Sequence, residues 1–563
     1  MENCTNKPKM PICIFFKDAR LVFKKDELGM EIARIAIPAA LALAADPIAS
    51  LIDTVFIGRL GTVQIAAVGV SIALFNQVSK ITIYPVVNIT TSFVAEEDAI
   101  KTVAIDEDES KDLEKGLSKC CQLSITPSES TSNTEEQEEG FETSTEDSHL
   151  SNEDTGGAVN SEEKSENLDK DLPINSHTKD VQFDSDTSGY NPPSITGGSS
   201  TMLKCAGKRK NIASASTALI VGGVLGLFQT IFLILTAKPL LKFMGVHSDS
   251  PMLKPARQYL TLRSLGAPAV LLSLAMQGVF RGIKDTKTPL YATVAGDVAN
   301  IILDPLFIFV LHMGVSGAAI AHVISQYLIS VILLWRLLQK VDLLPPSAKD
   351  LQFWRFLKSG GLLLVRVISV TFCVTLAASL AARHGSTPMA AFQVCLQIWL
   401  ATSLLADGLA VGGQAILASS IARKDYNKAT ATTARVLQLS LVLGLVLLSG
   451  IGIGMPFAAR LFTKDISVLH LIIIGTPFVA ATQPINVLAF VFDGINFGVS
   501  DFAYSAYSMV VVAILSILCL FFLSSSHGFI GIWVGLTIYI TLRALAGVLR
   551  IGTGTGPWHF LRR

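Results

Sequence analysis

Stretches of about 20 apolar residues recur along this 563-residue chain, and they constrain its fold more than any other feature. Half of all residues are hydrophobic. A backbone inside a bilayer must satisfy its own hydrogen bonds, so repeated stretches of this length predict membrane-spanning helices. The pattern excludes both a disordered protein and an ordinary soluble enzyme.

Twelve such helices can be placed. They lie near residues 31–58, 62–94, 212–237, 257–281, 287–311, 315–338, 359–382, 388–420, 430–460, 467–492, 502–524 and 528–550. Lys and Arg are concentrated in every second connection, which by the positive-inside rule predicts that both termini lie in the cytosol. Residues 1–29 lack the apolar region of a signal peptide, so we expect the first helix to remain as an uncleaved anchor.

One long polar segment interrupts this series after the second helix. Residues 96–200 hold 27 acidic and 7 basic residues, and they are rich in Ser, Thr and Gly. Such a composition cannot bury enough apolar surface to fold, so we expect a disordered acidic cytosolic loop. The simplest interpretation is a solvated tether, and regulation through its Ser and Thr residues is the alternative.

The two halves of the chain resemble each other. "GTVQIAAVGV" at 61–70 matches "GSTPMAAFQV" at 385–394, "FRG" at 280–282 aligns with "FDG" at 492–494, and "GVSG" at 314–317 with "GFIG" at 528–531. The offset falls from 324 to 212–214 because the acidic segment has no counterpart. Six helices repeated in the same order predict two bundles around a central cavity.

The predicted fold is therefore an all-α membrane protein with twelve transmembrane helices in two pseudo-symmetric six-helix lobes. Its parts are a cytosolic N-terminal segment (1–29), N-lobe helices 1–2 (30–95), the acidic loop (96–204), N-lobe helices 3–6 (205–340), an inter-lobe linker (341–358), C-lobe helices 7–12 (359–551) and a cytosolic C-terminal tail (552–563).

Acidic residues within the predicted spans are candidate functional groups, because each costs roughly 2.5–3.5 kcal/mol at the centre of a bilayer. There are six: Asp46, Asp53, Asp297, Asp304, Asp407 and Asp493. In "GDVANIILDPLFIF", Asp297, Asn300 and Asp304 form a polar stripe on one helix face. An amide beside a buried carboxylate can hold that acid in either protonation state, which suits a proton carrier. The alternative is that these groups only join two helices.

Asp46 and Asp53 lie two turns apart on one face of the first helix. Asp46 precedes Pro47, and Pro38 lies further upstream. Prolines weaken a helix, so we predict that Pro38, Asp46 and Pro47 mark a bend in a moving wall, while Asp53 serves protonation.

The second half instead places basic groups in the membrane. Arg366 lies in "GGLLLVRVISVTF" and Arg543 in "YITLRALAG", while Gln393 and Gln397 are one turn apart. An arginine in a bundle binds an anion or neutralises an acid, and Asp407 and Asp493 are available as such partners. We predict a substrate site from Arg366, Gln393, Gln397 and Arg543, although Arg543 could also reach the membrane surface.

Several classes of function are excluded by what the sequence lacks. It contains no P-loop, HExxH or GxSxG motif, and its eight cysteines show no CxxC spacing. We therefore expect no enzyme activity, no cofactor, no metal and no nucleic-acid partner, but contact with membrane lipid and transport driven by gradients. The oligomeric state is left open, and a monomer is compatible with the sequence.

Specific segments resemble the multidrug and toxic-compound extrusion (MATE) family of twelve-helix secondary exporters. These are "LIDTVFIGRLGTVQIAAVGV", "QGVFRGIKDTKTPLYATVAGDVANIILDPLFIF" and "GVSGAAIAHVISQY". "AIPAALALAADPIASLIDT", "TTSFVAEED", "LLADGLAVGGQAILA" and "FVFDGINFGVSDFAYSAYS" are similar to the plant citrate exporters of that family. The resemblance covers roughly residues 20–95 and 205–563.

The resemblance implies roles at matching positions. Asp53, Asn300 and Asp304 would form a proton or cation site, and Pro38 would match a proline associated with bending of the first helix. A threonine that completes the site in some relatives is replaced here by His322. Arg366 lies near a position that is acidic in drug-exporting relatives, and this departure fits an anionic substrate.

We thus predict proton-coupled export of citrate from the cytosol by rocker-switch alternating access across the plasma membrane. Sodium is the alternative coupling ion. The alternative functions are export of another organic or phenolic carboxylate by a carrier of the same family, and an anion channel.

Overall fold

The structure, a computed structural model, describes residues 24, 26–123, 210–244, 246, 249–343, 352–462 and 465–562. Almost all of the described chain is helical. The elements are α1 (Glu27–Gly58), α2 (Thr62–Leu123), β1 (Lys210–Asn211), α3 (Ala213–Phe243), α4 (Leu253–Ser264), α5 (Ala267–Gly282), α6 (Lys287–Pro305), the π-helix η3 (Leu306–Val310), α7 (Val315–Lys340), β2 (Val341–Asp342), α8 (Phe353–Arg383), α9 (Ser386–Ala422), α10 (Tyr426–Phe462), α11 (Ile466–Ala481), α12 (Gln483–Gly498), α13 (Phe502–Thr553) and the 3-10 helix η4 (Gly556–Arg562).

The chain divides into two compact units, residues 1–111 with 207–563, and residues 112–206. In the second unit only residues 112–123, the end of α2, are described. All predicted membrane helices belong to the first unit.

The described helices confirm the twelve predicted crossings. Nine are individually long and apolar enough to span a membrane, and the bent pairs α4–α5 and α11–α12 supply two more. The twelfth arises because α13 is two helices joined at Gly528, whose φ of 56° and ψ of −128° break the helical path. Helices 502–524 and 528–550 of the sequence prediction are these two halves.

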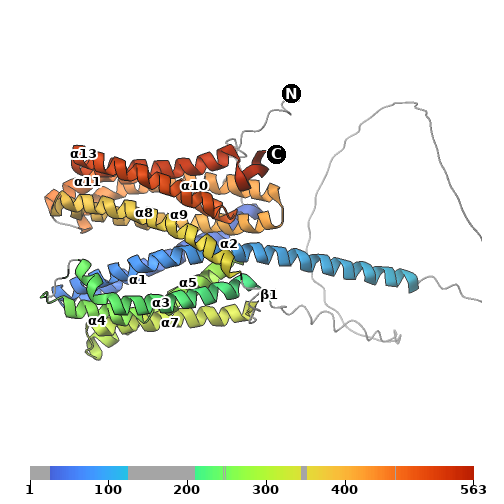
Figure 1. Cartoon of the computed structure of the whole chain (residues 1–563), viewed down its shortest axis with the longest axis horizontal. Helices are drawn as coiled ribbons and strands as arrows, with labels where there is room; N and C mark the ends of the chain where they lie inside the picture. Colours follow the sequence, from blue (N-terminus) through green and yellow to red (C-terminus); the bar gives the residue numbers. More distant parts are fainter. Residues whose placement is uncertain are drawn as a thin grey trace, which may run out of the picture. The chain divides into compact units, whose positions relative to one another are not determined.

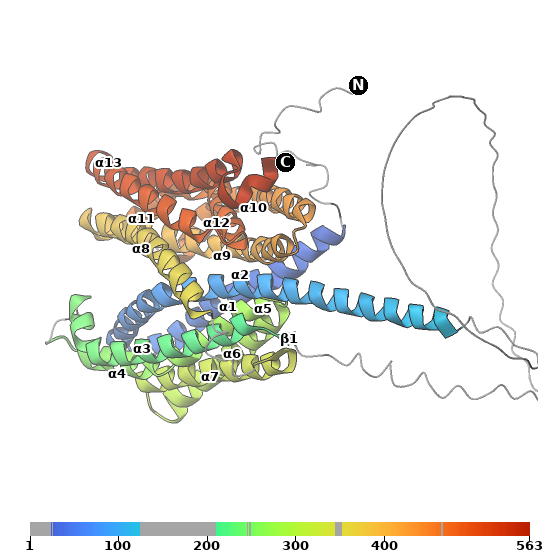
Figure 2. The same cartoon turned by 45° about the vertical axis from the view of Figure 1, so that its right-hand side comes forward.

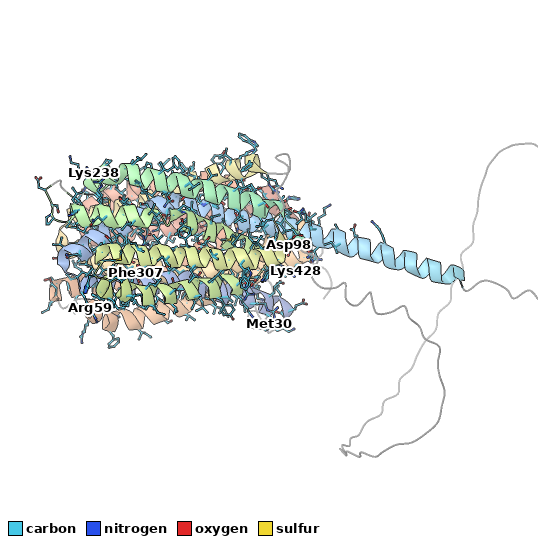
Figure 3. The ribbon with its side chains drawn as sticks, turned by 90° about the horizontal axis from the view of Figure 1, so that it is seen from below. Met30, Arg59, Asp98, Lys238, Phe307 and Lys428 are labelled. Atoms are coloured by element: carbon cyan, nitrogen blue, oxygen red, sulfur yellow. The ribbon has the colours of Figure 1, made fainter. Side chains whose placement is uncertain are left out.

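The helices form two lobes, and Figures 1 and 2 agree in showing α3–α7 on one side and α8–α13 on the other. We call α1–α7, with α2 up to residue 111, the N-lobe, and α8–α13 the C-lobe. Figure 3 places Met30, Asp98 and Lys428 at one end of the bundle and Arg59, Lys238 and Phe307 at the other. We call the first of these the Met30 end.

Matched backbone features support the predicted repeat. Gly314 has φ of 57° and ψ of −132°, which nearly equals the geometry of Gly528. The α4–α5 pair bends by 45° and α11–α12 by 48°. A Cβ added to Gly226 would lie 2.5 Å from Pro268 Cα, and one added to Gly444 would lie 2.4 Å from Pro484 Cα, so each lobe requires glycine at this crossing.

One detail of the repeat was wrong: "FRG" at 280–282 does not correspond to "FDG" at 492–494. Asp285 N donates to Phe280 O at 2.8 Å, and Asp501 N donates to Asn496 O at 2.9 Å, so the turns after α5 and α12 match at an offset of 216. The prediction missed this register by four residues, one helical turn. Glycine recurs every fourth residue in both helices, so the letters fit either register.

The lobes contact each other near the Met30 end. Ile32, Ile35, Ala36 and Ala39 of α1 are buried in an apolar cluster with residues of α9, α10 and α12. A Cβ on Gly408 of α9 would lie 2.5 Å from the Ala40 Cβ, so the two helices meet backbone to backbone. α1 is therefore shared between the lobes, its first half lying against the C-lobe.

Polar contacts also join the two lobes near the Met30 end. Ser92 Oγ donates to Phe497 O at 2.7 Å, and Gln414 Nε2 donates to Asn88 O at 2.8 Å. The Glu31 carboxylate pairs with Lys284 Nζ at 2.7 Å and with Lys428 Nζ at 2.9 Å, which joins α1 to both lobes.

α2 extends beyond the predicted membrane helix at 62–94 and remains helical to Leu123. Residues 96–123 contain no proline, and Lys101 Nζ lies 2.7 Å from Glu97 Oε1, an (i, i+4) pair that favours a helix. The remainder of the predicted disordered loop, through residue 204, lies outside the described residues.

Glu97 also caps a helix that is distant in sequence. Its Oε1 and Oε2 accept hydrogen bonds from the main-chain N–H groups of Ala213 and Ser214, at 2.8 and 2.9 Å. Ile212, at the N-cap of α3, offers no side-chain acceptor, so Glu97 supplies one to the first turn of α3.

The predicted linker and tail are partly structured. Val341 and Asp342 of β2 pair in parallel with Lys210 and Asn211 of β1. In η4, the fully buried Trp558 donates its indole N–H to Asn496 Oδ1 at 3.2 Å.

Candidate functional site

The N-lobe brings together Asp53, Asn300 and Asp304, three of the four residues predicted for proton or cation binding, while the fourth, Asp297, pairs with Asp46. Asn300 Nδ2 donates to Asp53 Oδ1 at 2.7 Å, which joins α6 to α1. Asp304, one turn further along α6, interacts directly with Asp53. Asn300 is 2% exposed and Asp304 1% exposed. We call Asp53, Asn300 and Asp304 the carboxylate cluster.

The carboxylate cluster has unused hydrogen-bonding capacity. Neither oxygen of Asp304 receives a hydrogen bond from a described residue, and the same is true of Asn300 Oδ1. A buried carboxylate is strongly destabilised unless a proton or a cation neutralises it. This arrangement can therefore take up a proton, and its oxygen ligands also suit a hard cation such as sodium. Among the described residues there is no group of three or more His, Cys, Asp or Glu side chains that could hold a metal ion.

An arginine that the sequence prediction overlooked lies beside this cluster. Arg263 of α4 is 8% exposed, and its charge acts on Asp46, Asp53 and Asp304. Its Nη1 donates to Tyr259 Oη at 3.0 Å, and its guanidinium lies 5.1 Å from the centroid of the Phe75 ring. The signal was present, because Arg263 falls inside the predicted span 257–281.

Asp46 and Asp297 form a second acidic pair between the same two helices, α1 and α6. α1 runs unbroken from Glu27 to Gly58 through Pro38 and Pro47. The role of Pro38, Asp46 and Pro47 in bending stays a prediction. His322 of α7 lies within the electrostatic influence of Arg263, near the same region.

A cavity of about 280 Å³ lies between the lobes, lined by residues of α1, α2, α5, α8, α9, α12 and α13. Two acidic side chains, Asp407 and Asp493, face it. Four basic side chains also line it: Lys80, Arg281, Arg366 and Arg543. The charge of its lining is therefore positive.

α12 organises the C-lobe side of this cavity. Phe490, Asp493 and Phe497 lie on one face of α12, at i, i+3 and i+7. Both Arg366 of α8 and Arg543 of α13 form ion pairs with Asp493 Oδ2. The Arg543 guanidinium lies 4.4 Å from the Phe490 ring centroid, and that of Arg366 lies 5.1 Å from the Phe497 ring centroid. We call Arg366, Arg543 and Asp493 the arginine cluster.

The two arginines differ in how many of their N–H groups are hydrogen-bonded within the protein. Arg543 Nε donates to Asp493 Oδ2 at 3.0 Å, and its Nη2 donates to the same oxygen. Arg366 Nη2 lies in contact with Asp493. Neither this atom nor Arg366 Nε makes a well-aligned hydrogen bond to a described residue. Arg366 is 7% exposed and borders the cavity, so its N–H groups can serve a bound anion.

The N-lobe side adds two basic groups that the sequence prediction missed. Lys80 of α2 and Arg281 of α5 form no ion pair within the described residues. Arg281 makes one long hydrogen bond, from Nη2 to Gln277 Oε1 at 3.5 Å. Lys80 falls inside the predicted span 62–94, so its charge within a membrane helix could have marked it as a candidate site residue.

The remaining predicted substrate residues lie elsewhere. Gln393 and Gln397 are exposed on α9 and are not among the residues that line the cavity. Their role in binding substrate stays a prediction.

Comparison with known proteins agrees with this architecture. The model of the MatE family matches residues 204–306 and 363–522. Protein DETOXIFICATION 42 of Arabidopsis thaliana is 61% identical over 559 residues, covering 99% of this chain and 98% of the relative. Protein DETOXIFICATION 43 of the same plant is 53% identical, covering 99% and 97%. The crystal structure of MATE in the straight conformation superposes with a TM-score of 0.67 at 16% identity, covering 95% of this chain and 98% of that one. The chain belongs to the MATE family of membrane transporters.

Proposed function

We propose that this protein exports citrate from the cytosol in exchange for protons. The observation that carries the proposal is the positive lining of the central cavity, where four basic side chains face two acidic ones. Citrate carries three carboxylates, and Arg366 offers buried N–H groups for one of them. A volume of about 280 Å³ is comparable with the smallest ligand pockets, roughly 300 Å³.

The carboxylate cluster supports the coupling ion. Asp53 and Asp304 interact within a buried site that includes the Asn300 amide, and Asp304 has no hydrogen-bond donor among the described residues. Protonation from the outside would neutralise this cluster and reset the carrier. Sodium would bind through the same oxygen atoms, so an experiment must distinguish the two coupling ions, proton and sodium.

The closed packing at the Met30 end supports alternating access. Apolar contacts of α1 with α9 and the Ser92 and Gln414 hydrogen bonds join the two lobes near that end. Basic residues concentrate there, including Lys284, Lys340 and Lys428, so we assign the Met30 end to the cytosol and the chain to the plasma membrane. Citrate would be released when this side is closed and would enter after the lobes rock apart there.

The membrane potential makes such export favourable. Moving one charge across 100 mV is worth about 2.3 kcal/mol, so a trivalent anion leaving an inside-negative cell gains roughly 7 kcal/mol. Proton binding would then govern the direction and the gating of the cycle more than its energy supply.

Purified full-length protein in liposomes tests the proposal. We expect labelled citrate to move in response to an imposed pH gradient, to exchange with citrate on the opposite side, and to be unaffected by a sodium gradient. Transport driven only by a sodium gradient would identify sodium instead of the proton as the coupling ion. Transport of salicylate but not of citrate would identify another carboxylate as the substrate. Conductance too large for a carrier, and insensitive to Asp53→Asn, would indicate an anion channel instead.

A further inference from the structure

The four basic residues of the cavity are divided between the lobes, and their partners differ. Arg366 and Arg543, from the C-lobe, share the Asp493 carboxylate. Lys80 and Arg281, from the N-lobe, form no ion pair within the described residues. The C-lobe pair is thus held by a direct ion pair, whereas the charge of Asp407 acts on Arg281 without a direct ion pair between them.

The N-lobe pair is placed where a ligand would meet it. Lys80 lies on the same face of α2 as Asn76 and Tyr84, one turn away on either side, and all three line the cavity. Arg281 is 7% exposed, and its Nη2 has only the 3.5 Å contact with Gln277. A buried guanidinium without a direct ion pair is stabilised when an anion binds to it, because its desolvation is then compensated.

The basic side chains of the cavity come from both lobes. Lys80 and Arg281 approach from α2 and α5, whereas Arg366 approaches from α8 in the other lobe. A ligand with carboxylates at two ends could reach Arg366 with one and Lys80 or Arg281 with the other.

We propose that Lys80 and Arg281 form a second carboxylate-binding half-site, so that the cavity selects di- and tricarboxylates because such a ligand bridges the two lobes. This inference rests on the proposed function, since it takes the cavity to be the substrate site. A bridging ligand also draws the lobes together, which a monocarboxylate held by Arg366 alone does not do.

Binding to the purified, detergent-solubilised full-length protein tests the half-site. Citrate is the tricarboxylate probe and benzoate the monocarboxylate probe, both measured by calorimetry. We expect Lys80→Met to weaken citrate binding by about tenfold or more, the effect of losing one charged hydrogen bond, and to change benzoate binding by less than about twofold. Arg366→Met should weaken both ligands.

Three variants serve as matched controls. Lys80→Arg keeps the charge and should retain citrate affinity. Lys238→Met removes an exposed lysine of α3 at the opposite end from Met30, outside the cavity, and should change neither ligand. Arg281→Lys, which keeps a charge in a tightly packed position, should lower citrate affinity less than Arg281→Met.

The outcomes separate this inference from the proposed function. If the unaltered protein does not bind citrate, the proposed function fails. If it binds citrate and Lys80→Met binds citrate equally well, only the second half-site is refuted. Equal loss of citrate and benzoate in Lys80→Met would also refute it, whereas benzoate too weak to detect in every form, together with weakened citrate in Lys80→Met, would support it.

Discussion

The carboxylate cluster of the N-lobe and the arginine cluster of the C-lobe are opposite solutions within one repeated fold. In the first, Asp53 and Asp304 lie together with an amide between α1 and α6, and Asp304 lacks a donor among the described residues. In the second, Asp493 sits between two arginines that stack on phenylalanines. One cluster carries excess negative charge and the other excess positive charge.

Under the proposed function, this difference would let a duplicated scaffold serve two ions. Both lobes have the same bent helix pair and the same glycine break before their last helix. The backbone is therefore nearly equivalent, and a few side chains set where the acidic and basic groups of each lobe lie. A carrier that exchanges an organic anion for protons needs one site of each kind.

The largest effect is expected from a substitution in the carboxylate cluster of the N-lobe. Asp304→Asn keeps the shape of the side chain but cannot release or bind a proton, so proton-driven citrate transport should fall to the level of protein-free liposomes. Citrate binding at equilibrium should persist, because the arginine cluster is intact. Transport that retained its full dependence on pH would contradict the assignment of Asp304.

Asp493→Ala breaks the C-lobe side and should act on stability. It leaves Arg366 and Arg543 buried together without a counter-charge, a loss of about 3–5 kcal/mol in the free energy of unfolding. Thermal unfolding in detergent measures the change. Asp304→Asn is the control, since it removes no ion pair and should unfold near the temperature of the unaltered protein.

The double variant Asp493→Ala/Arg543→Met sharpens the same point. Removing one arginine together with the acid relieves the repulsion, so stability should partly recover. A double variant as unstable as the sum of its single changes would show that the arginine cluster is not one electrostatic unit.

Glu31→Gln tests how the two lobes are held against each other, and its expected effect is smaller. It removes the ion pairs of Glu31 with Lys284 and Lys428, each worth up to about 1 kcal/mol at a partly exposed site. The closure at the Met30 end should open more often. A cysteine placed in the cavity by Asn88→Cys should then react several-fold faster with an impermeant thiol reagent applied from the Met30 side. An unchanged reaction rate would show that the Glu31 ion pairs do not hold the lobes together.

The smallest effect concerns Asp26, the N-cap of α1. Hydrogen bonds from Arg435, and then from the main-chain N–H of Gly29, lower the pKa of Asp26. A lowered pKa in the folded state means that this contact contributes stability above the ordinary aspartate pKa of about 4 and loses it as the pH falls.

Asp26→Asn should therefore cost about 1 kcal/mol at pH 7, near the upper end for a partly exposed pair. The difference between the variant and the unaltered protein should shrink as the pH falls below 4. Urea titration at several pH values measures it. A constant difference across this range would mean that the Asp26 charge does not stabilise α1.

The hydrophobic pattern predicted the fold because every span of a membrane helix must be apolar along its full length. The same rule hides finer detail. Glycine recurs every fourth residue in α5 and α12, so the register of the repeat was ambiguous by one turn. The extension of α2 beyond residue 94 was missed because its acidic composition, rather than its spacing, guided the prediction.

The carboxylate cluster was predicted from polar residues on one helix face, together with the family resemblance. Arg263 and Lys80 were missed although both lie in predicted spans, because whether a basic residue faces a cavity or the membrane surface depends on helix rotation. The one-turn spacing of Gln393 and Gln397 likewise did not show that their helix face is exposed, and their role in binding substrate stays a prediction. The sequence shows which charges enter the membrane, and only packing shows which of them face one another.

Glu97 has a consequence for how proteins of this fold can diverge. Because its carboxylate joins the first turn of α3 to α2 directly, the position of α3 does not depend on the length of the chain that connects the two helices. Insertions and deletions within residues 124–209 are therefore free to accumulate during evolution without shifting the membrane helices, as long as an acidic side chain is retained at position 97.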